Sequence, residues 1–112
     1  MKLATDEDRT SARTLPAIVF EAIVRKRCVA ATYNRLNVVL APHVIFMKND
    51  ALHVGAVTIT RGGERPREEK MGVFKLDGLG VLTLTEEEFD VRPVFEPEDE
   101  RWVDSALMKV EA

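Results

Sequence analysis

The feature of this 112-residue chain that most constrains its fold is a run of short apolar segments between residues 28 and 89. β-Branched and aromatic residues recur there in short blocks, which polar or Gly-containing stretches interrupt at residues 34–37, 48–50, 61–63 and 77–78. Short apolar blocks separated by turn-forming residues favour strands joined by tight turns over helices. Five closely spaced strands in a flat sheet would expose long unpaired edges, so we expect them to curl into a small barrel or sandwich.

Composition indicates one ordinary globular domain, since 46% of the residues are hydrophobic and 31% are charged. The longest apolar stretch, residues 38–47, is well short of the ~20 residues that a membrane span needs. Asp6, Glu7 and Asp8 stand where a secretory signal would need its apolar stretch, and a single cysteine, Cys28, agrees with a reducing compartment. We therefore expect a cytoplasmic protein without membrane contact. The formal net charge of −3 means that any contact with nucleic acid needs a local basic patch.

The pattern along the chain predicts three regions: a flexible leader over residues 1–13, a barrel domain with an N-terminal helix over residues 14–95, and a C-terminal amphipathic helix over residues 96–112. Thr14 is suited to cap the first helix, whose first turn tolerates Pro16. The last helix is predicted from an apolar stripe at helical spacing, formed by Trp102, Val103, Ala106, Leu107 and Val110. The expected fold class is α+β, mainly β, with two helices flanking the strands.

Strands are predicted over residues 29–35, 38–47, 51–60, 71–76 and 79–85. Pro42 cannot donate to a strand ladder, so the second strand is expected to bend or to lie at an edge there. The loop after this strand decides how two histidines are oriented. A loop of two or four residues places Phe46 opposite His53 and turns His43 to the other face, whereas a three-residue loop brings both histidines to one face. The residues leave both registers open.

Two stretches are similar to a known family. Residues 20–33 contain a basic helix that runs into a strand ending in Tyr, and residues 74–77 read Phe-Lys-Leu-Asp, close to a Phe-Arg-Leu-Asp run of that family. These two stretches, together with the order of the segments over residues 17–90, resemble the WYL domain. This domain is a bacterial sensory module that is usually attached to a DNA-binding helix-turn-helix. The resemblance implies a five-stranded Sm-like or SH3-like barrel and a stand-alone, degenerate WYL-like protein. At the family's signature tyrosine this chain has His53, and Gly72 and Gly78 replace two arginines that hold anionic ligands in the family.

The candidate ligand site consists of polar residues set among the apolar strands, namely Tyr33, Arg35, His43, His53 and Lys75. The tyrosine and the histidines would contribute hydrogen bonds or stacking, and Arg35 and Lys75 would contribute charge. We expect a non-enzymatic sensory or regulatory module that binds a small anionic ligand, such as a nucleotide, or a short nucleic-acid segment. Because none of its helices pairs as a helix-turn-helix, it would act through a partner, either a DNA-binding protein or a second copy of the chain.

An alternative is a degenerate barrel that serves as a structural or oligomerisation protein without a ligand. The apolar stripe at residues 102–110, or an open strand edge, would then join it to a second copy or to a different chain. Enzymatic chemistry has little support, and no catalytic residue is assigned. Ser11 and Ser105 are far in sequence from either histidine, and the acidic runs at residues 86–88 and 98–100 lack apolar surroundings that would raise a pKa. Two histidines without a nearby Cys or correctly spaced carboxylate do not complete a metal site, and no cofactor is expected.

Overall fold

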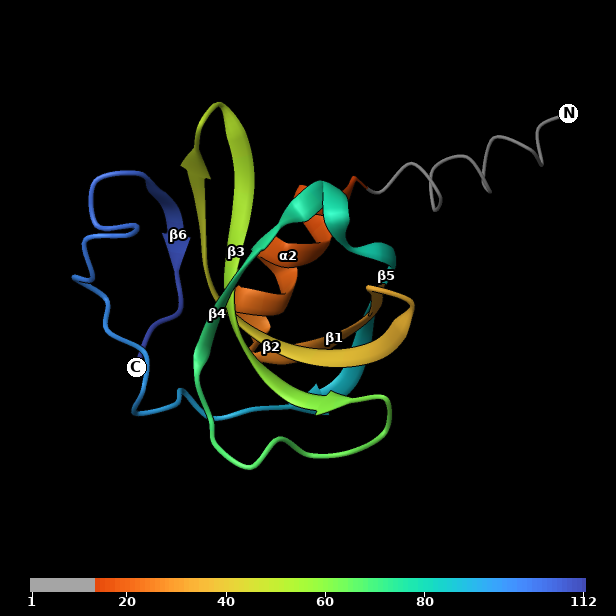
Figure 1. Ribbon diagram of the computed structural model, residues 1–112. Coiled ribbons are helices and arrows are strands. Elements are labelled where there is room, and N and C mark those ends of the chain that lie inside the picture. The colour runs from red at the N-terminus through yellow and green to blue at the C-terminus, as the bar shows by residue number, and fades with distance from the viewer. Residues whose placement is uncertain (1–13) are drawn as a thin grey trace, which may run out of the picture.

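The computed structural model describes residues 14–112, which fold mainly into β-strands with one α-helix (Figure 1). The elements follow in the order α2 (Leu15–Arg25), β1 (Arg27–Tyr33), β2 (Leu36–Lys48), β3 (Ala51–Arg61), β4 (Met71–Lys75), the 3-10 turn η1 (Leu76–Gly78), β5 (Gly80–Glu88) and β6 (Ala106–Lys109). The mainly β fold with an N-terminal helix is confirmed. The predicted leader, residues 1–13, lies outside the described residues. None of the helices in the described part has the length and apolar content that a membrane span requires.

Helix α2 begins and ends as its sequence predicts. The Thr14 hydroxyl oxygen accepts a 3.3 Å hydrogen bond from the backbone N–H of Ala17, and Pro16 lies in the first turn, where its missing N–H costs nothing. Lys26 ends the helix in the left-handed conformation, with φ 55°. The buried face of the helix consists of Ile18, Val19, Ala22 and Ile23.

The strands form one antiparallel sheet in the order β4-β3-β2-β1-β5, with β6 added beside β2. The hairpins β1–β2 and β2–β3 each turn through two residues with positive φ: Asn34 and Arg35 in the first, Asn49 and Asp50 in the second. This is the type I′ geometry, which matches the right-handed twist of the strands and is tolerated by Asn and Asp. Local turn chemistry therefore sets both hairpins.

The sheet is curled, yet open at its edges. Tyr33 on β1 and Phe74 on β4 are separated by two strands in the sheet order, but their ring centroids are 5.2 Å apart at an interplanar angle of 81°. Such a contact requires β4 to bend back over β1. Within residues 14–112 no strand pairing joins β4 to β5, and η1 connects the two.

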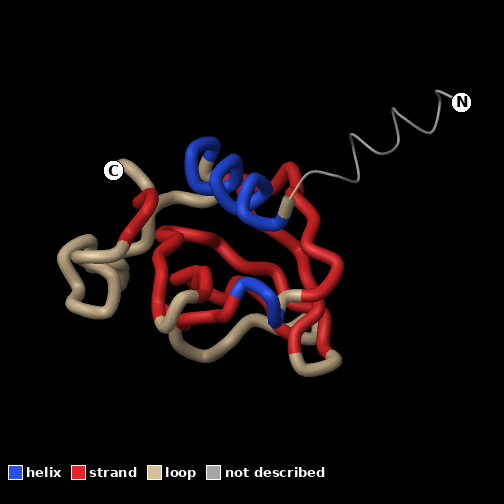
Figure 2. The backbone as a smooth tube through the Cα atoms, turned by 90° about the horizontal axis from the view of Figure 1, so that it is seen from above, coloured by secondary structure: helices blue, strands red, loops and turns tan. Residues whose placement is uncertain are grey.

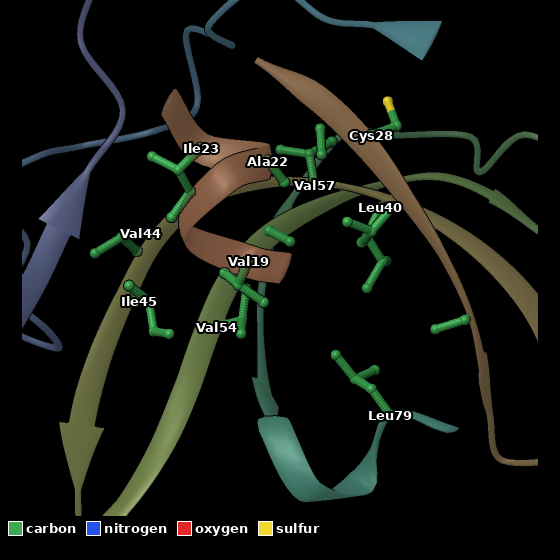
Figure 3. Packing of buried hydrophobic residues seen from close by; sticks show 14 of the residues in the cluster. Val19, Ala22, Ile23, Cys28, Leu40, Val44, Ile45, Val54, Val57 and Leu79 are labelled. Atoms are coloured by element: carbon green, nitrogen blue, oxygen red, sulfur yellow. The ribbon is translucent and has the colours of Figure 1, made fainter. Parts of the chain in front are cut away.

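The core lies between α2 and the inner face of the curled sheet. Figure 2, seen from above, shows α2 lying across one side of the sheet. Figure 3 shows the buried side chains of the helix together with those of β2 and β3. Residues from these three elements that are at most 1% exposed include Val19, Ala22, Ile23, Leu40, Ile45, Val54 and Val57. Burial of these aliphatic side chains is the main stabilising contribution to the fold.

The predicted C-terminal helix over residues 96–112 is wrong. Consecutive turns lead to β6, which pairs antiparallel with β2. Trp102, on which the helical stripe was centred, is fully buried and donates from Nε1 to the carbonyl of Glu96 at 3.0 Å. Its ring contacts Phe46 and Phe95, at centroid distances of 5.7 and 5.9 Å. The apolar residues of this segment recur at helical spacing, but the packing of the Trp102 ring against the sheet favours a different conformation.

The edge of β2 explains why a strand forms at this end of the chain. The pairing of β2 with β1 ends at Leu40, so the second half of β2 offers unpaired backbone groups. β6 fills this edge opposite residues 44–46, and the N–H of Val110 donates to the carbonyl of His43 at 2.8 Å. The blue C-terminal segment accordingly lies beside β2 and β3 in Figure 1. A helix would have left this edge unsatisfied.

The β2–β3 loop has two residues, and Phe46 faces His53 as predicted for that case. The ladder is irregular between Pro42 and Val44, however, which interrupts the simple alternation on which opposite faces for the two histidines were predicted. Both histidines belong to one row of rings with neighbouring centroids 5.0–5.9 Å apart, formed by His53, Phe46, Trp102, Phe95, His43 and Phe89.

Candidate functional site

His43 is a structural residue that no ligand can reach. Its side chain is fully buried, and Nε2 accepts a 3.1 Å hydrogen bond from the backbone N–H of Arg92. The ring proton must therefore sit on Nδ1, which donates to the carbonyl of Ala41 at 2.8 Å. Burial lowers the pKa of His43, so the neutral imidazole is favoured. The assignment of His43 to a ligand pocket is thus corrected.

Tyr33 and Arg35 lie apart from the other predicted site residues. The Tyr33 ring packs against the hydrophobic core and meets the ring of Phe74 edge-on. Arg35 is exposed in the β1–β2 turn, with φ 67°. Neither residue lines any of the cavities described below. The five predicted residues therefore do not form one pocket.

His53 and Lys75, by contrast, are neighbours. They are cross-strand partners on β3 and β4, and His53 is also the cross-strand partner of Phe46 on β2. Paired positions point to the same face of a sheet, which here is the face on which Trp102 packs. We call it the outer face. The His53 ring lies 5.8 Å from the Phe46 ring, and its Nδ1 is 3.0 Å from the carbonyl oxygen of Ala51.

A pocket of about 280 Å³ opens beside this pair. It is lined by Phe46, Met47, Lys48, Val73 and Arg101, which come from β2, β4 and the C-terminal segment. We call it the outer-face pocket. Lys75 is not part of this lining, but it lies two positions from Val73 on β4, on the same face. The pocket therefore has an apolar floor, two cations in its lining and a third cation nearby on β4.

Arg101 is held in place by two neighbours. Its guanidinium carbon lies 4.6 Å from the centre of the Trp102 ring, and its Nε and Nη2 atoms each donate a 3.0 Å hydrogen bond to the carboxylate of Asp99. This two-pronged pairing holds the pKa of Asp99 below its usual range and raises the pKa of Arg101. Lys48 and Lys75 have no ion-pair partner within residues 14–112. Within the described residues, Lys48 thus lines the pocket without a counter-charge, and Lys75 lies nearby on β4 in the same condition.

Sequence reasoning missed Lys48 and Arg101. Lys48 was assigned to the hairpin loop, although its spacing of two from Phe46 puts both side chains on one face of an extended strand. That signal was present in the sequence. Arg101 carried no usable signal, because its segment was expected to be a helix and its docking depends on Trp102.

Cys28 is poorly suited to act as a nucleophile. The Cys28 thiol is buried, and desolvation raises its pKa to about 11, so almost no thiolate exists near neutral pH. In the described residues, no group of three or more His, Cys, Asp or Glu side chains is placed to hold a metal ion. The outer-face pocket is suited to binding.

Comparisons with protein-family models, with curated proteins and with solved structures find no match for this chain. The WYL-like resemblance therefore stays a prediction. His53 and Lys75 come from the two places where that resemblance sets the signature and the Phe-Lys-Leu-Asp run, and they are cross-strand partners on β3 and β4. The chemistry of the outer-face pocket is the basis for a function.

Proposed function

We propose that this chain is a non-enzymatic sensory or regulatory module that binds a small anionic molecule with an apolar body in the outer-face pocket. The supporting observation is that Lys48 and Arg101, from separate segments, line the pocket together with Phe46 and Val73. Lys75 adds a third cation two positions from Val73 on β4. Cationic heads above an apolar floor suit a carboxylate or phosphate attached to a ring. With about 280 Å³, the pocket lies near the lower end of ligand pockets, which span roughly 300–1,000 Å³, so the ligand is nucleotide-sized or smaller.

Of the two predicted ligand classes, a single anionic molecule is favoured over a nucleic-acid segment. The cations border one compact pocket, whereas a bound strand needs a row of cations that follows its backbone. The net charge of −3 also opposes long-range attraction of a polyanion. A nucleotide satisfies the geometry without such a row.

The wider assignment is a WYL-like module with an Sm-like or SH3-like barrel. The strand order β4-β3-β2-β1-β5, the ring contact between Tyr33 and Phe74, and the 3-10 turn between β4 and β5 support a small barrel. A buried, uncharged Cys28 thiol suits a reducing cytoplasm. Regulation would pass to a partner protein, because the described residues form one helix only.

The alternative, an oligomerisation protein without a ligand, has less support. It relied on the apolar stripe at residues 102–110, but Trp102 is 0% and Val110 7% exposed within a single chain. These side chains are already used in packing the C-terminal segment on the sheet. Leu107, at 54% exposed, and the open strand edges remain for such a role.

The test is a titration of the ¹⁵N-labelled full chain with AMP, GMP and an aromatic carboxylate such as indole-3-acetate, followed by NMR. A binding ligand should shift the amides of residues 46–48, 73–75 and 101. Lys48→Ala and Lys75→Ala should each weaken binding about fivefold to tenfold, which is about 1–1.4 kcal/mol, because each removes a charged contact. Binding should also weaken as salt is added.

Arg67→Ala is the matched control, since Arg67 is an exposed cation in the β3–β4 connection and does not line the pocket. Its affinity should equal that of the unchanged protein. The proposal fails if no compound in the panel binds, if the shifted amides lie elsewhere, or if Arg67→Ala weakens binding as much as Lys48→Ala. Silence across the panel together with a stable dimer would favour the alternative.

A further inference from the structure

A second cavity lies at the end of the curled sheet where the β2–β3 hairpin, η1 and the start of α2 come together. These elements gather at the upper side of Figure 1, and Figure 2 shows α2 and η1 on opposite sides of this end. The cavity is an open groove of about 700 Å³, more than twice the volume of the outer-face pocket. Its apolar lining comes from five elements and includes Leu15, Pro16, Met47, Leu52, Leu76 and Leu107. We call it the end groove.

Two of these apolar side chains are exposed to solvent. Leu107 on β6 is 54% exposed and Met47 on β2 is 38% exposed. Both lie at the rim of the same groove, so the exposed apolar surface is contiguous rather than scattered. Contiguous exposed apolar surface on a soluble domain marks a place where another molecule binds.

The charge at the end groove is negative. Asp50, in the β2–β3 turn, and Asp77, in η1, line it, and no Lys or Arg does so. Both carboxylates are exposed on tight turns whose backbone is fixed by the hairpin and by the 3-10 turn. The sign is opposite to that of the outer-face pocket, so the two sites select different molecules.

We propose that the end groove docks a short segment of a partner protein that carries apolar side chains and at least one Lys or Arg. The apolar groups would cover Met47 and Leu107, and the cation would lie between Asp50 and Asp77. Charge complementarity supports this occupant: an acidic or purely apolar segment would leave two carboxylates facing it without a counter-charge. The inference stands on the groove alone and does not depend on the ligand of the outer-face pocket.

One residue connects the two sites. Met47 lines both the end groove and the outer-face pocket, between Phe46 and Lys48 on β2. Consecutive strand residues point to opposite faces, so this short stretch of β2 contributes to both. A molecule bound at one site would thus contact the strand that forms the other.

The probe for the experiment is a short amidated peptide that alternates Leu and Lys and carries a fluorescent label, with a Leu–Glu peptide of equal length as its counterpart. Anisotropy is measured with the full chain. The Leu–Lys peptide should bind and the Leu–Glu peptide should not. Asp50→Asn and Asp77→Asn should each weaken binding at least about threefold and reduce its salt dependence. Asn is tolerated at the positive φ of position 50, so the turn is preserved.

Asp104→Asn is the control, because Asp104 is also an exposed acid but lies outside the end groove, and the affinity of this variant should not change. Leu107→Ser should weaken binding as well, whereas Lys48→Ala should not, which separates this site from the outer-face pocket. Equal binding of both peptides, or unchanged affinity in Asp50→Asn and Asp77→Asn, would overturn the proposal. A concentration-dependent dimer that Leu107→Ser abolishes would also overturn it, because a second copy of the chain would then fill the groove. Shifts of the amide signals of residues 1–13 in Leu107→Ser would do the same, because the chain's own N-terminal residues would then be the occupant.

Discussion

The backbone N–H of Arg92 donates a 3.1 Å hydrogen bond to Nε2 of His43, 49 residues earlier in the chain. The bond joins the arm after β5 to the irregular stretch of β2. The carbonyl of His43 accepts from Val110, so one residue ties both parts of the C-terminal segment to the sheet. Arg92 also places its Nε 3.0 Å from a carboxylate oxygen of Glu69, which fastens the β3–β4 connection to the same arm.

Stability should therefore depend on pH through His43. Burial lowers its pKa in the folded protein, whereas the unfolded chain has the ordinary value of about 6.5. As pH falls below about 6.5, the unfolded state takes up a proton that the folded state does not. The free energy of unfolding should then decrease, with a slope approaching about 1.4 kcal/mol per pH unit, until the folded pKa is reached. Urea unfolding at a series of pH values between 7 and 5 measures this.

His43→Phe is the matched variant for that measurement. It removes the titrating group and leaves the partly buried N–H of Arg92 without this acceptor, so it should cost about 1–3 kcal/mol at pH 7. Its pH profile between 7 and 5 should be flatter than that of the unchanged protein. Parallel profiles for the two proteins would show that another group causes the effect.

Trp102 should be the most important single side chain of the C-terminal segment. It is fully buried, contacts Phe46 and Phe95, and donates a hydrogen bond to Glu96. Trp102→Ala should cost about 3–5 kcal/mol in chemical unfolding followed by circular dichroism. Trp102→Phe keeps the ring contacts but loses the Nε1 donor, so it should cost clearly less. Equal costs for both variants would mean that ring packing does not hold this segment.

Glycine is required at position 55 and not at position 78. A Cβ at Gly55 would lie 2.6 Å from Cγ1 of Val44, whereas nothing lies within 4 Å of a Cβ at Gly78. Gly55→Ala should cost about 1–3 kcal/mol because the new methyl group clashes with the side chain of Val44 on the neighbouring strand. Gly78→Ala should change the unfolding free energy by less than about 0.5 kcal/mol. Thermal melts of the two variants compare them, and a tolerated Gly55→Ala would contradict this packing.

Val81 should be a site where substitution stabilises the protein. It has φ 48°, in the left-handed region that β-branched residues rarely adopt, and its side chain is 81% exposed. Val81→Asn relieves this strain and gives up little packing, so it should gain about 1 kcal/mol. Val81→Ile keeps the β-branch and should gain nothing. A lower melting temperature for Val81→Asn would mean that Val81 has a contact worth more than its strain.

Much of the fold followed from short stretches of sequence. The Thr14 cap, the Asn-rich turns at residues 34–35 and 49–50, and the alternating strands depend on backbone preferences within a few residues. The candidate site followed less directly from the sequence. Of the five residues predicted to share a pocket, His53 and Lys75 are cross-strand partners and His43 is buried, while Lys48 and Arg101, which line the outer-face pocket, were not among the five.

The sequence by itself determined which segments extend, where they turn and where the helix begins, because steric limits and local hydrogen bonds decide those features. Only the tertiary structure decided that Trp102 closes over the sheet, that β6 completes β2, and that His43 is buried among rings. These outcomes depend on which edge and which face remain uncovered once the hairpins have formed. Residues 52 to 65 positions apart make these contacts, and no local pattern encodes the result.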